Sequence, residues 1–351
     1  MNIMISWQTL LKESPVDWLL EESNPSVRYF TLRDILGKRE DDPQVIAAKR
    51  AISRSKVVSK IFSKQNAEGY WEEPFNPYHP KYKSSYWQIM ILAQLGMDKT
   101  DERVERACEY VFQFQLEDGG FSSYTPERAV EEHTLLLKKG KKLPPRGEFA
   151  SSLVFEHQYS CLTGNMAAAL IRIGYANDKR VKKALDWLVK IQNQDGGWLC
   201  PYWRAHIRDK HGCFYGTICP LEAFSEVRKE NLTKEMKETI EKGAEFLLMH
   251  RLFKADHHSY KIINKAWLTL SFPWFYGYNI LRGLDVLTRL DYVKDERLSD
   301  AIEVLLRKRQ KTGTWILENT PVGRMHINIE AKDKPSKWIT LFALRALKRL
   351  S

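Results

Sequence analysis

Three cysteines whose thiols could bind a metal or act as nucleophiles lie between residues 161 and 213. Cys161 and Cys213 each stand at the start of an apolar helical segment, and Cys200 lies in the segment between them. A helix N-terminus lowers the pKa of a cysteine toward the thiolate, which is the form that binds zinc. The residues therefore predict a zinc site of Cys161, Cys200, Cys213 and His211. The alternative is that these thiols are buried and inert.

The segments that must position these residues are helical. Strand-like alternation is nearly absent, and apolar residues recur at three-and-four spacing in segments that begin with Asp. Those segments cover residues 101–115, 178–192 and 295–310. Similar turns follow the helical segments, and they read QNAEGYW (65–71), QLEDGGF (115–121), QNQDGGW (192–198) and QKTGTW (310–315). The sequence predicts an all-α chain of helix-pair repeats.

More apolar helical segments follow the turns, and they complete the repeats. They span residues 84–96, 160–175, 212–227, 275–290 and 336–350. Stacked pairs of this kind bury a continuous core, so we expect one domain over residues 1–351. The longer spacing between the second and third turns predicts a charged loop insertion over residues 122–150.

The Q-x-x-D-G-G-W turn, together with this alternation of helices, resembles the α/α toroid superfamily. That superfamily contains squalene and oxidosqualene cyclases and the β subunits of protein prenyltransferases. The resemblance covers nearly the whole chain and implies an (α/α) toroid with inner and outer rings of helices. It also implies an enzyme that handles isoprenoids, either prenyltransferase-like or terpene-cyclase-like.

The chain departs from the catalytic motifs of both branches. The prenyltransferase resemblance implies zinc bound by an Asp and a Cys two residues apart, with a later His. Cys213 matches that cysteine, His211 stands in place of the Asp, and the later segment PWFYGYNIL (273–281) contains no His. Cyclases use an Asp-x-Asp-Asp cluster as a general acid, and this sequence contains none. The catalytic residues are therefore left unassigned.

Aromatic side chains on the predicted inner segments could line an apolar cavity and stabilise carbocations through their π faces. The alternative for each ring is ordinary core packing. The expected cavity residues are Tyr86, Trp87, Phe214, Tyr215, Trp274, Tyr276, Tyr278 and Trp338. Arg204, Arg208 and Lys210, beside the cysteines, are the candidates for binding an anion such as diphosphate, and the alternative is solvated loop charge.

The composition limits the partners. A formal net charge of +11 favours anionic partners, but no nucleic-acid-binding module is recognisable, so we expect no nucleic acid. No apolar run is long enough for a membrane span and no signal peptide begins the chain, which predicts a cytoplasmic protein; peripheral membrane contact and a protein partner stay open. The alternative function is a non-catalytic toroid that binds a lipid or a protein partner, with a structural metal or only buried thiols.

Overall fold

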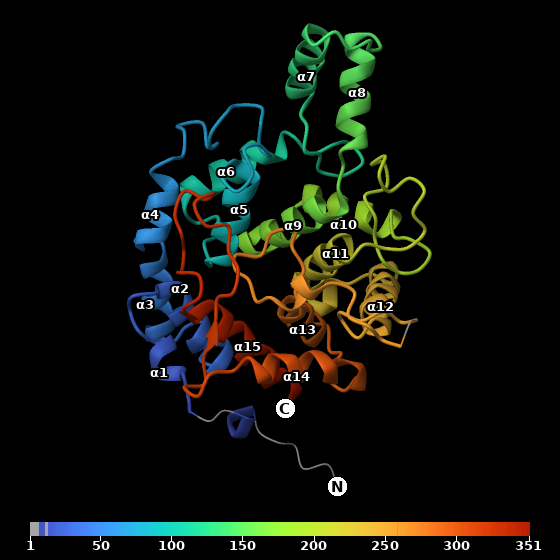
Figure 1. Ribbon diagram of the computed structural model, residues 1–351. Coiled ribbons are helices and arrows are strands. Elements are labelled where there is room, and N and C mark those ends of the chain that lie inside the picture. Colours follow the sequence, from blue (N-terminus) through green and yellow to red (C-terminus); the bar gives the residue numbers. More distant parts are fainter. Residues whose placement is uncertain (1–6, 11–12, 258) are drawn as a thin grey trace. The chain divides into compact units, whose positions relative to one another are not determined.

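The computed structural model describes residues 7–10, 13–257 and 259–351, and these residues are mostly helical (Figure 1). The chain divides into two compact units. Unit 1 comprises Met1–Lys60, Leu95–Met97 and Leu247–Ser351, and unit 2 comprises Ile61–Gln94 and Asp98–Phe246. The all-α prediction is confirmed for the described residues, whereas one domain over residues 1–351 stays a prediction.

Unit 2 alternates apolar helices with polar-faced helices. The apolar helices are α5 (Ser85–Gln94), α9 (Ser160–Leu170), continued by the π-helical turn η3 (Ile171–Tyr175), and α11 (Phe214–Glu226). The polar-faced helices are α6 (Glu102–Phe112) and α10 (Lys179–Lys190), and the short η4 (Lys229–Asn231) follows α11. Every residue of α5 is buried, which explains its lack of a polar face. The helices α4 (Lys56–Phe62) and α12 (Lys234–Met249) belong in part to each unit.

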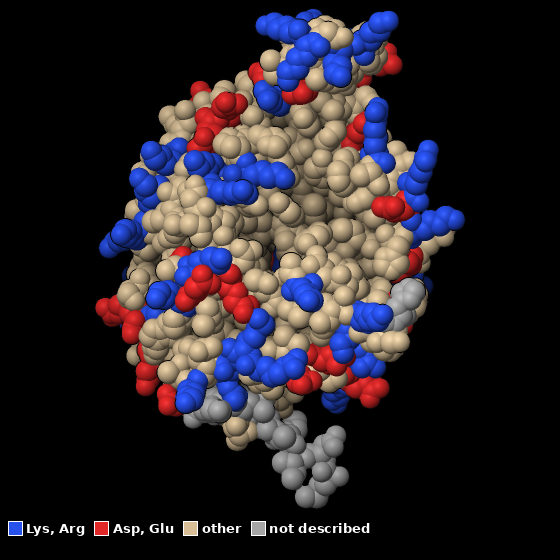
Figure 2. All heavy atoms as spheres, viewed as in Figure 1, with Lys and Arg blue, Asp and Glu red and all other residues tan. Residues whose placement is uncertain are grey.

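The insertion predicted as a charged loop over residues 122–150 is instead part of a helical hairpin. Helix α7 (Pro126–Lys138) runs beside α8 (Arg146–Glu156), and Thr125 caps α7 by accepting from the Arg128 amide at 3.2 Å. The difference arises because apolar residues within the charged run, Ala129 from α7 and Val154 from α8, pack on each other. Lys and Arg gather at the tip of the hairpin (Figure 2), at Lys138, Lys139, Lys141, Lys142 and Arg146.

Unit 1 contains the remaining elements. They are η1 (Trp7–Leu10), α1 (Val16–Leu19), α2 (Pro25–Phe30), the π-helical turn η2 (Thr31–Ile35), α3 (Pro43–Ile52), η5 (Lys265–Leu268), α13 (Ile280–Arg289), η6 (Glu296–Leu298), α14 (Ser299–Arg307), β1 (Trp315–Ile316), β2 (Pro335–Ser336) and α15 (Lys337–Leu350). The two short strands form one antiparallel pair in which Trp315 faces Ser336. Among the described helices, none has the length and apolar character needed to cross a membrane.

The glutamine of the repeated turn holds two structural elements together. Gln192 donates from Nε2 to the Gly196 carbonyl and to the Thr239 carbonyl, both at 2.8 Å. The first bond closes the turn, and the second fixes it to α12, the next polar-faced helix. The same pair of bonds links Gln115 to Gly119 (2.9 Å) and Arg180 (2.8 Å), and Gln65 to Gly69 (3.1 Å) and Arg103 (3.0 Å).

The aromatic residue of the turn connects the two helices of a repeat. Trp198 donates from Nε1 to the Leu188 carbonyl at 2.8 Å, and its backbone amide donates to the Thr217 hydroxyl of α11 at 3.0 Å. Trp71 and Trp315 repeat both bonds, with Ile61 and Ser85, and with Leu305 and Thr340. The turn thus fixes the N-terminal end of each apolar helix against the preceding polar-faced helix.

A glycine in this turn is required by both its backbone angle and its surroundings. Gly196 has φ of +86°, and a Cβ there would lie 2.3 Å from the Lys242 carbonyl oxygen. Gly140, at the hairpin tip, has φ of +75°, but a Cβ there would have no neighbouring atom within 4 Å, so this glycine serves as a matched control. We expect Gly140→Ala to cost only the left-handed backbone penalty, about 1–2 kcal/mol.

We expect Gly196→Ala to lower the free energy of unfolding by at least about 2 kcal/mol more than Gly140→Ala, because the methyl group must displace the backbone of α12. Urea unfolding of the two variants and of the wild type measures this difference. Equal losses in the two variants would show that the turn does not need its close approach to α12.

Candidate functional site

Two of the three predicted cysteines stand at the ends of helices, and a loop brings the third to them. Cys161 lies in the first turn of α9, and Cys213 is the residue that precedes α11. Cys200 follows the QNQDGGW turn. The loop from 200 to 213 returns to this turn because the Cys213 amide donates to the Trp198 carbonyl at 2.8 Å. Gly197 and Gly212 make this possible, since a Cβ on Gly212 would lie 2.7 Å from the Gly197 Cα.

Cys161 and His206 both lie beside Cys200, and we call these three residues the thiol–imidazole cluster. The Cys161 thiol and the His206 ring each lie close enough to the Cys200 thiol to change its acidity. The Cys200 backbone amide lies 3.2 Å from His206 Nδ1. Ser160 Oγ lies 3.9 Å from the Cys200 sulfur. Cys200 is only 7% exposed, so these contacts form largely away from water.

These contacts separate the acidities of the two thiols. The neighbouring Cys161 thiol is the largest cause that lowers the pKa of Cys200, to about 5, and His206 lowers it further against the effect of burial. The Cys200 thiol and burial raise the pKa of Cys161 well above its ordinary value, and the neighbouring Cys200 raises the pKa of His206. Because Nδ1 of His206 accepts from the Cys200 backbone amide, the proton of the neutral ring lies on Nε2. The cluster thus places a proton donor beside a proton acceptor.

The predicted zinc ligands are only partly brought together. Cys213 lies close enough to Cys161 and Cys200 to interact with them electrostatically. His211 points elsewhere: Nδ1 lies 2.9 Å from the Gly212 carbonyl and its ring packs 5.1 Å from the Phe246 ring. Across the described part of the chain, no three or more His, Cys, Asp or Glu side chains are arranged to hold a metal ion. The zinc site stays a prediction, and the imidazole beside the thiols is His206.

An apolar pocket of about 390 Å³ lies under the α7–α8 hairpin, a volume within the range of small-molecule sites. Its lining residues are Leu116, Glu117, Asp118, Pro126, Ala150, Ser151, Val154, Phe155 and Gln158. Gln158 is 1% exposed, and its Oε1 has no hydrogen-bond partner among the described residues. The ring centroids of Phe155 and Tyr202 are 4.0 Å apart, and Tyr202 lies in the loop that carries His206. Gln158 lies two residues before the start of α9. Phe155 thus connects the lining of the pocket to the loop that carries His206.

The aromatic residues predicted to line a cavity are mostly packed within the two units. In unit 2, Tyr86, Trp87 and Phe214 are buried and Tyr215 is half-buried. In unit 1, Trp274, Tyr278 and Trp338 are buried and Tyr276 is half-buried. Trp274 stacks on Phe342 with ring centroids 4.1 Å apart, and Trp338 stacks on Phe272 with ring centroids 4.5 Å apart. Their role as a cavity lining stays a prediction.

Other aromatic residues surround the cluster, and no sequence pattern singles them out. The ring centroid of Trp203 lies 4.7 Å from that of His206 and 6.2 Å from that of Tyr159. Arg204, Arg208 and Lys210 are exposed on the same loop, and Arg204 lies 3.7 Å from Glu156. An anion-binding role for these three residues stays a prediction.

Comparison with known proteins identifies the family. The family model of the squalene-hopene cyclase C-terminal domain matches residues 68–320, a range that contains the whole cluster and the whole pocket. The chain belongs to this family. The relation to squalene cyclases expected from the turn motif is confirmed, and so is the α/α toroid as its fold class.

Individual relatives of this squalene-hopene cyclase family member are distant. Lanosterol synthase erg7A of Aspergillus fumigatus is 22% identical over 242 residues, which are 62% of this chain and 28% of that protein. The chain thus spans less than a third of the length of this relative. The type II terpene cyclase MstE from Scytonema is similar in structure, with a TM-score of 0.44 and 14% identity over 93% of this chain and 87% of that one. A protein from Actinoplanes has a TM-score of 0.31 and 13% identity over 86% and 99% of the two chains.

The contacts of Cys200 generate a prediction about pH. Because its lowered pKa is about 5, Cys200 should be a thiol below that pH and a thiolate above it. The ultraviolet absorbance of the thiolate, followed during titration of metal-free protein, should rise near pH 5. Cys200→Ser should abolish this rise, and His206→Asn should move it to higher pH.

Cys108→Ser is the matched control, since burial raises the pKa of Cys108 and this thiol should not contribute near pH 5. A wild-type protein that forms thiolate only in the ordinary cysteine range would refute the lowered pKa of Cys200.

Proposed function

We propose that this chain is an isoprenoid-handling enzyme of the terpene-cyclase type, and that the thiol–imidazole cluster is its reactive centre. Membership in the squalene-hopene cyclase family supports a terpene-cyclase-like isoprenoid function. The observation that carries the finer proposal is that Phe155, in the lining of an apolar pocket of ligand size, packs on Tyr202 in the loop that carries His206. The apolar chain of the substrate would occupy the pocket, and its reacting end would face the cluster.

The cluster contains the groups that acid–base chemistry on an isoprenoid requires. His206 can donate a proton, and the Cys200 sulfur can accept one, from positions in contact with each other. The π faces of Tyr159 and Trp203 lie nearby, where they could stabilise a developing cation. Gln158 offers a buried acceptor for a hydroxyl group of the ligand. This set would take the place of the absent Asp-x-Asp-Asp cluster.

Zinc is a second component of the proposal. Two thiols and one imidazole are the donor types that zinc prefers, and Cys213 could supply a further thiol; the side chains would have to turn toward one point, because no such arrangement exists among the described residues. His206 would then supply the nitrogen ligand in place of His211. Zinc bound to these residues would act as a Lewis acid on an oxygen of the substrate.

An activity assay tests this proposal. The purified protein is incubated with acyclic isoprenoids, including squalene, its epoxide and a geranylgeranyl chain, and products are separated by mass spectrometry. Cys200→Ser and His206→Asn should each reduce product formation by about 100-fold or more, since positioned acid–base groups contribute this much. Cys108→Ser should keep wild-type activity, because Cys108 lies in α6 outside the cluster.

Metal analysis of the same samples separates the two components of the proposal. Zinc in the wild type and in Cys108→Ser, but not in Cys200→Ser, would support the zinc site. Wild-type activity in both cluster variants would refute the reactive centre. Tight isoprenoid binding without turnover in the wild type would favour the non-catalytic lipid-binding alternative.

A further inference from the structure

The end of the α7–α8 hairpin combines basic and apolar side chains on one exposed surface, and we call residues 135–146 the hairpin tip. This segment contains no Asp or Glu, and the nearest carboxylates along the chain are those of Glu132 and Glu148. In Figure 2, Lys and Arg gather where the hairpin of Figure 1 ends. The basic residues of the tip are all exposed, and they are Lys138, Lys139, Lys141, Lys142 and Arg146.

These positive charges are not neutralised within the hairpin. The ion pairs of its two helices lie outside the tip, where Arg128 pairs with Glu131 and Glu156 pairs with Arg204. None of the basic side chains of the tip forms an ion pair with a residue that the structure describes. The tip therefore presents unpaired positive charge to the solvent.

Leucine side chains are exposed among these charges. Leu135 is 43% exposed and Leu137 is 49% exposed. Successive residues of an α-helix lie about 100° apart around its axis, so these two leucines project from nearly opposite sides of α7. A groove on a partner protein receives one face of a helix and would cover only one of them. An apolar phase that surrounds the end of the hairpin would cover both.

The backbone of the hairpin tip is closed by its own hydrogen bonds. At the end of α7, the amides of residues 139–141 donate to the carbonyls of residues 135–137 over distances between 2.9 and 3.2 Å. The buried His133 donates from Nε2 to the Pro144 carbonyl at 3.0 Å. Unpaired backbone groups are costly where water is scarce. The last turn of α7 can therefore enter an apolar phase without exposing unpaired carbonyls.

The rest of unit 2 leaves the tip open. The core of the hairpin lies toward its other end, where Val154 and Ala129 pack with Leu116 and Tyr124 from the chain before α7. At the tip, a Cβ on Gly140 would meet no atom within 4 Å. The leucines and the basic side chains are thus accessible together.

We propose that the hairpin tip is a docking surface for the anionic phospholipid face of a membrane, with Leu135 and Leu137 inserted among the lipids. Anionic head groups attract Lys and Arg side chains that lie close to them, and the leucines gain free energy by leaving water. Lysine stems can lie along apolar surface while their ammonium groups reach the head groups. A soluble polyanion such as RNA would use the charges but leave the leucines in water. The surface uses no residue of the thiol–imidazole cluster and does not rest on the proposed function.

Co-sedimentation of the full chain with lipid vesicles tests the proposal. The wild type should bind vesicles of equimolar phosphatidylcholine and phosphatidylserine at least about tenfold more tightly than vesicles of phosphatidylcholine alone. Added salt should weaken this binding. The double variant Lys141→Glu, Lys142→Glu should lose at least about tenfold in affinity for the mixed vesicles, because it reverses charge at the tip. Leu135→Ser with Leu137→Ser should lose at least about tenfold as well, because it removes the inserting groups.

The matched control is Lys182→Glu with Lys183→Glu, which makes the same change of net charge at exposed positions of α10, outside the hairpin. It should bind the mixed vesicles like the wild type, and thermal unfolding without vesicles shows that each variant is folded. Equal binding of the wild type to both kinds of vesicle would overturn the proposal. So would wild-type affinity in either tip variant; in the leucine variant it would assign the tip to soluble polyanions. An equal loss in the control would assign binding to overall charge and would also overturn it.

Discussion

The double hydrogen bond of the turn glutamine is the interaction on which the arrangement of unit 2 depends. One carboxamide nitrogen closes the turn and also binds a backbone carbonyl of the next polar-faced helix, as Gln192 does with Gly196 and Thr239. The tryptophan of the turn then fixes the N-terminal end of the following apolar helix. These bonds pair backbone groups that the turn would otherwise leave without a partner. The positions of the helix starts, where Cys161 and Cys213 lie, follow from this pattern.

The candidate site is a consequence of the same turn. Asp195 of the QNQDGGW turn accepts from the Gly212 amide at 2.6 Å, so the loop that follows Cys200 is closed onto the turn that precedes it. Closure brings His206 to Cys200 and leaves His211 at the outer edge of the loop against Phe246. The same segment therefore contributes both to the fold and to the candidate site. The fold fixes the backbone around Cys200, and the loop supplies the imidazole that changes its acidity.

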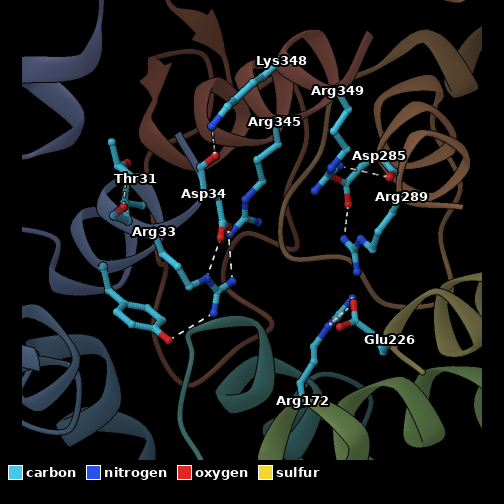
Figure 3. Close-up of polar contacts among 12 residues, drawn as sticks. Thr31, Arg33, Asp34, Arg172, Glu226, Asp285, Arg289, Arg345, Lys348 and Arg349 are labelled. Atoms are coloured by element: carbon cyan, nitrogen blue, oxygen red, sulfur yellow. Dashed lines mark hydrogen bonds and ion pairs between the residues drawn. The ribbon is translucent and has the colours of Figure 1, made fainter. Parts of the chain in front are cut away.

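Local signals in the sequence are sufficient for the helices. Asp101, Asp178 and Asp295 each cap the helix that the sequence predicts them to begin, because a side-chain carboxylate at that position accepts a free backbone amide. The hairpin escapes prediction because its few apolar residues are spaced among many charges and become a core only when α7 and α8 meet. The sequence does not favour His206 over His211 because sequence distance to Cys213 says nothing about the path of a loop. The ion pairs of Asp34 with Arg345 and of Asp285 with Arg349 (Figure 3) escape prediction because they join η2, α13 and α15, which are far apart in the chain.

The central claim is that an isoprenoid binds beside the thiol–imidazole cluster. Photo-crosslinking with a geranylgeranyl probe that carries a diazirine, followed by peptide mapping, tests this most directly because it reports where the chain binds whether or not turnover occurs. The account predicts labelled residues within 150–161 and 198–206, with labelling reduced by an excess of unlabelled probe. Competed labelling confined to other peptides, with none in these two segments, would contradict it.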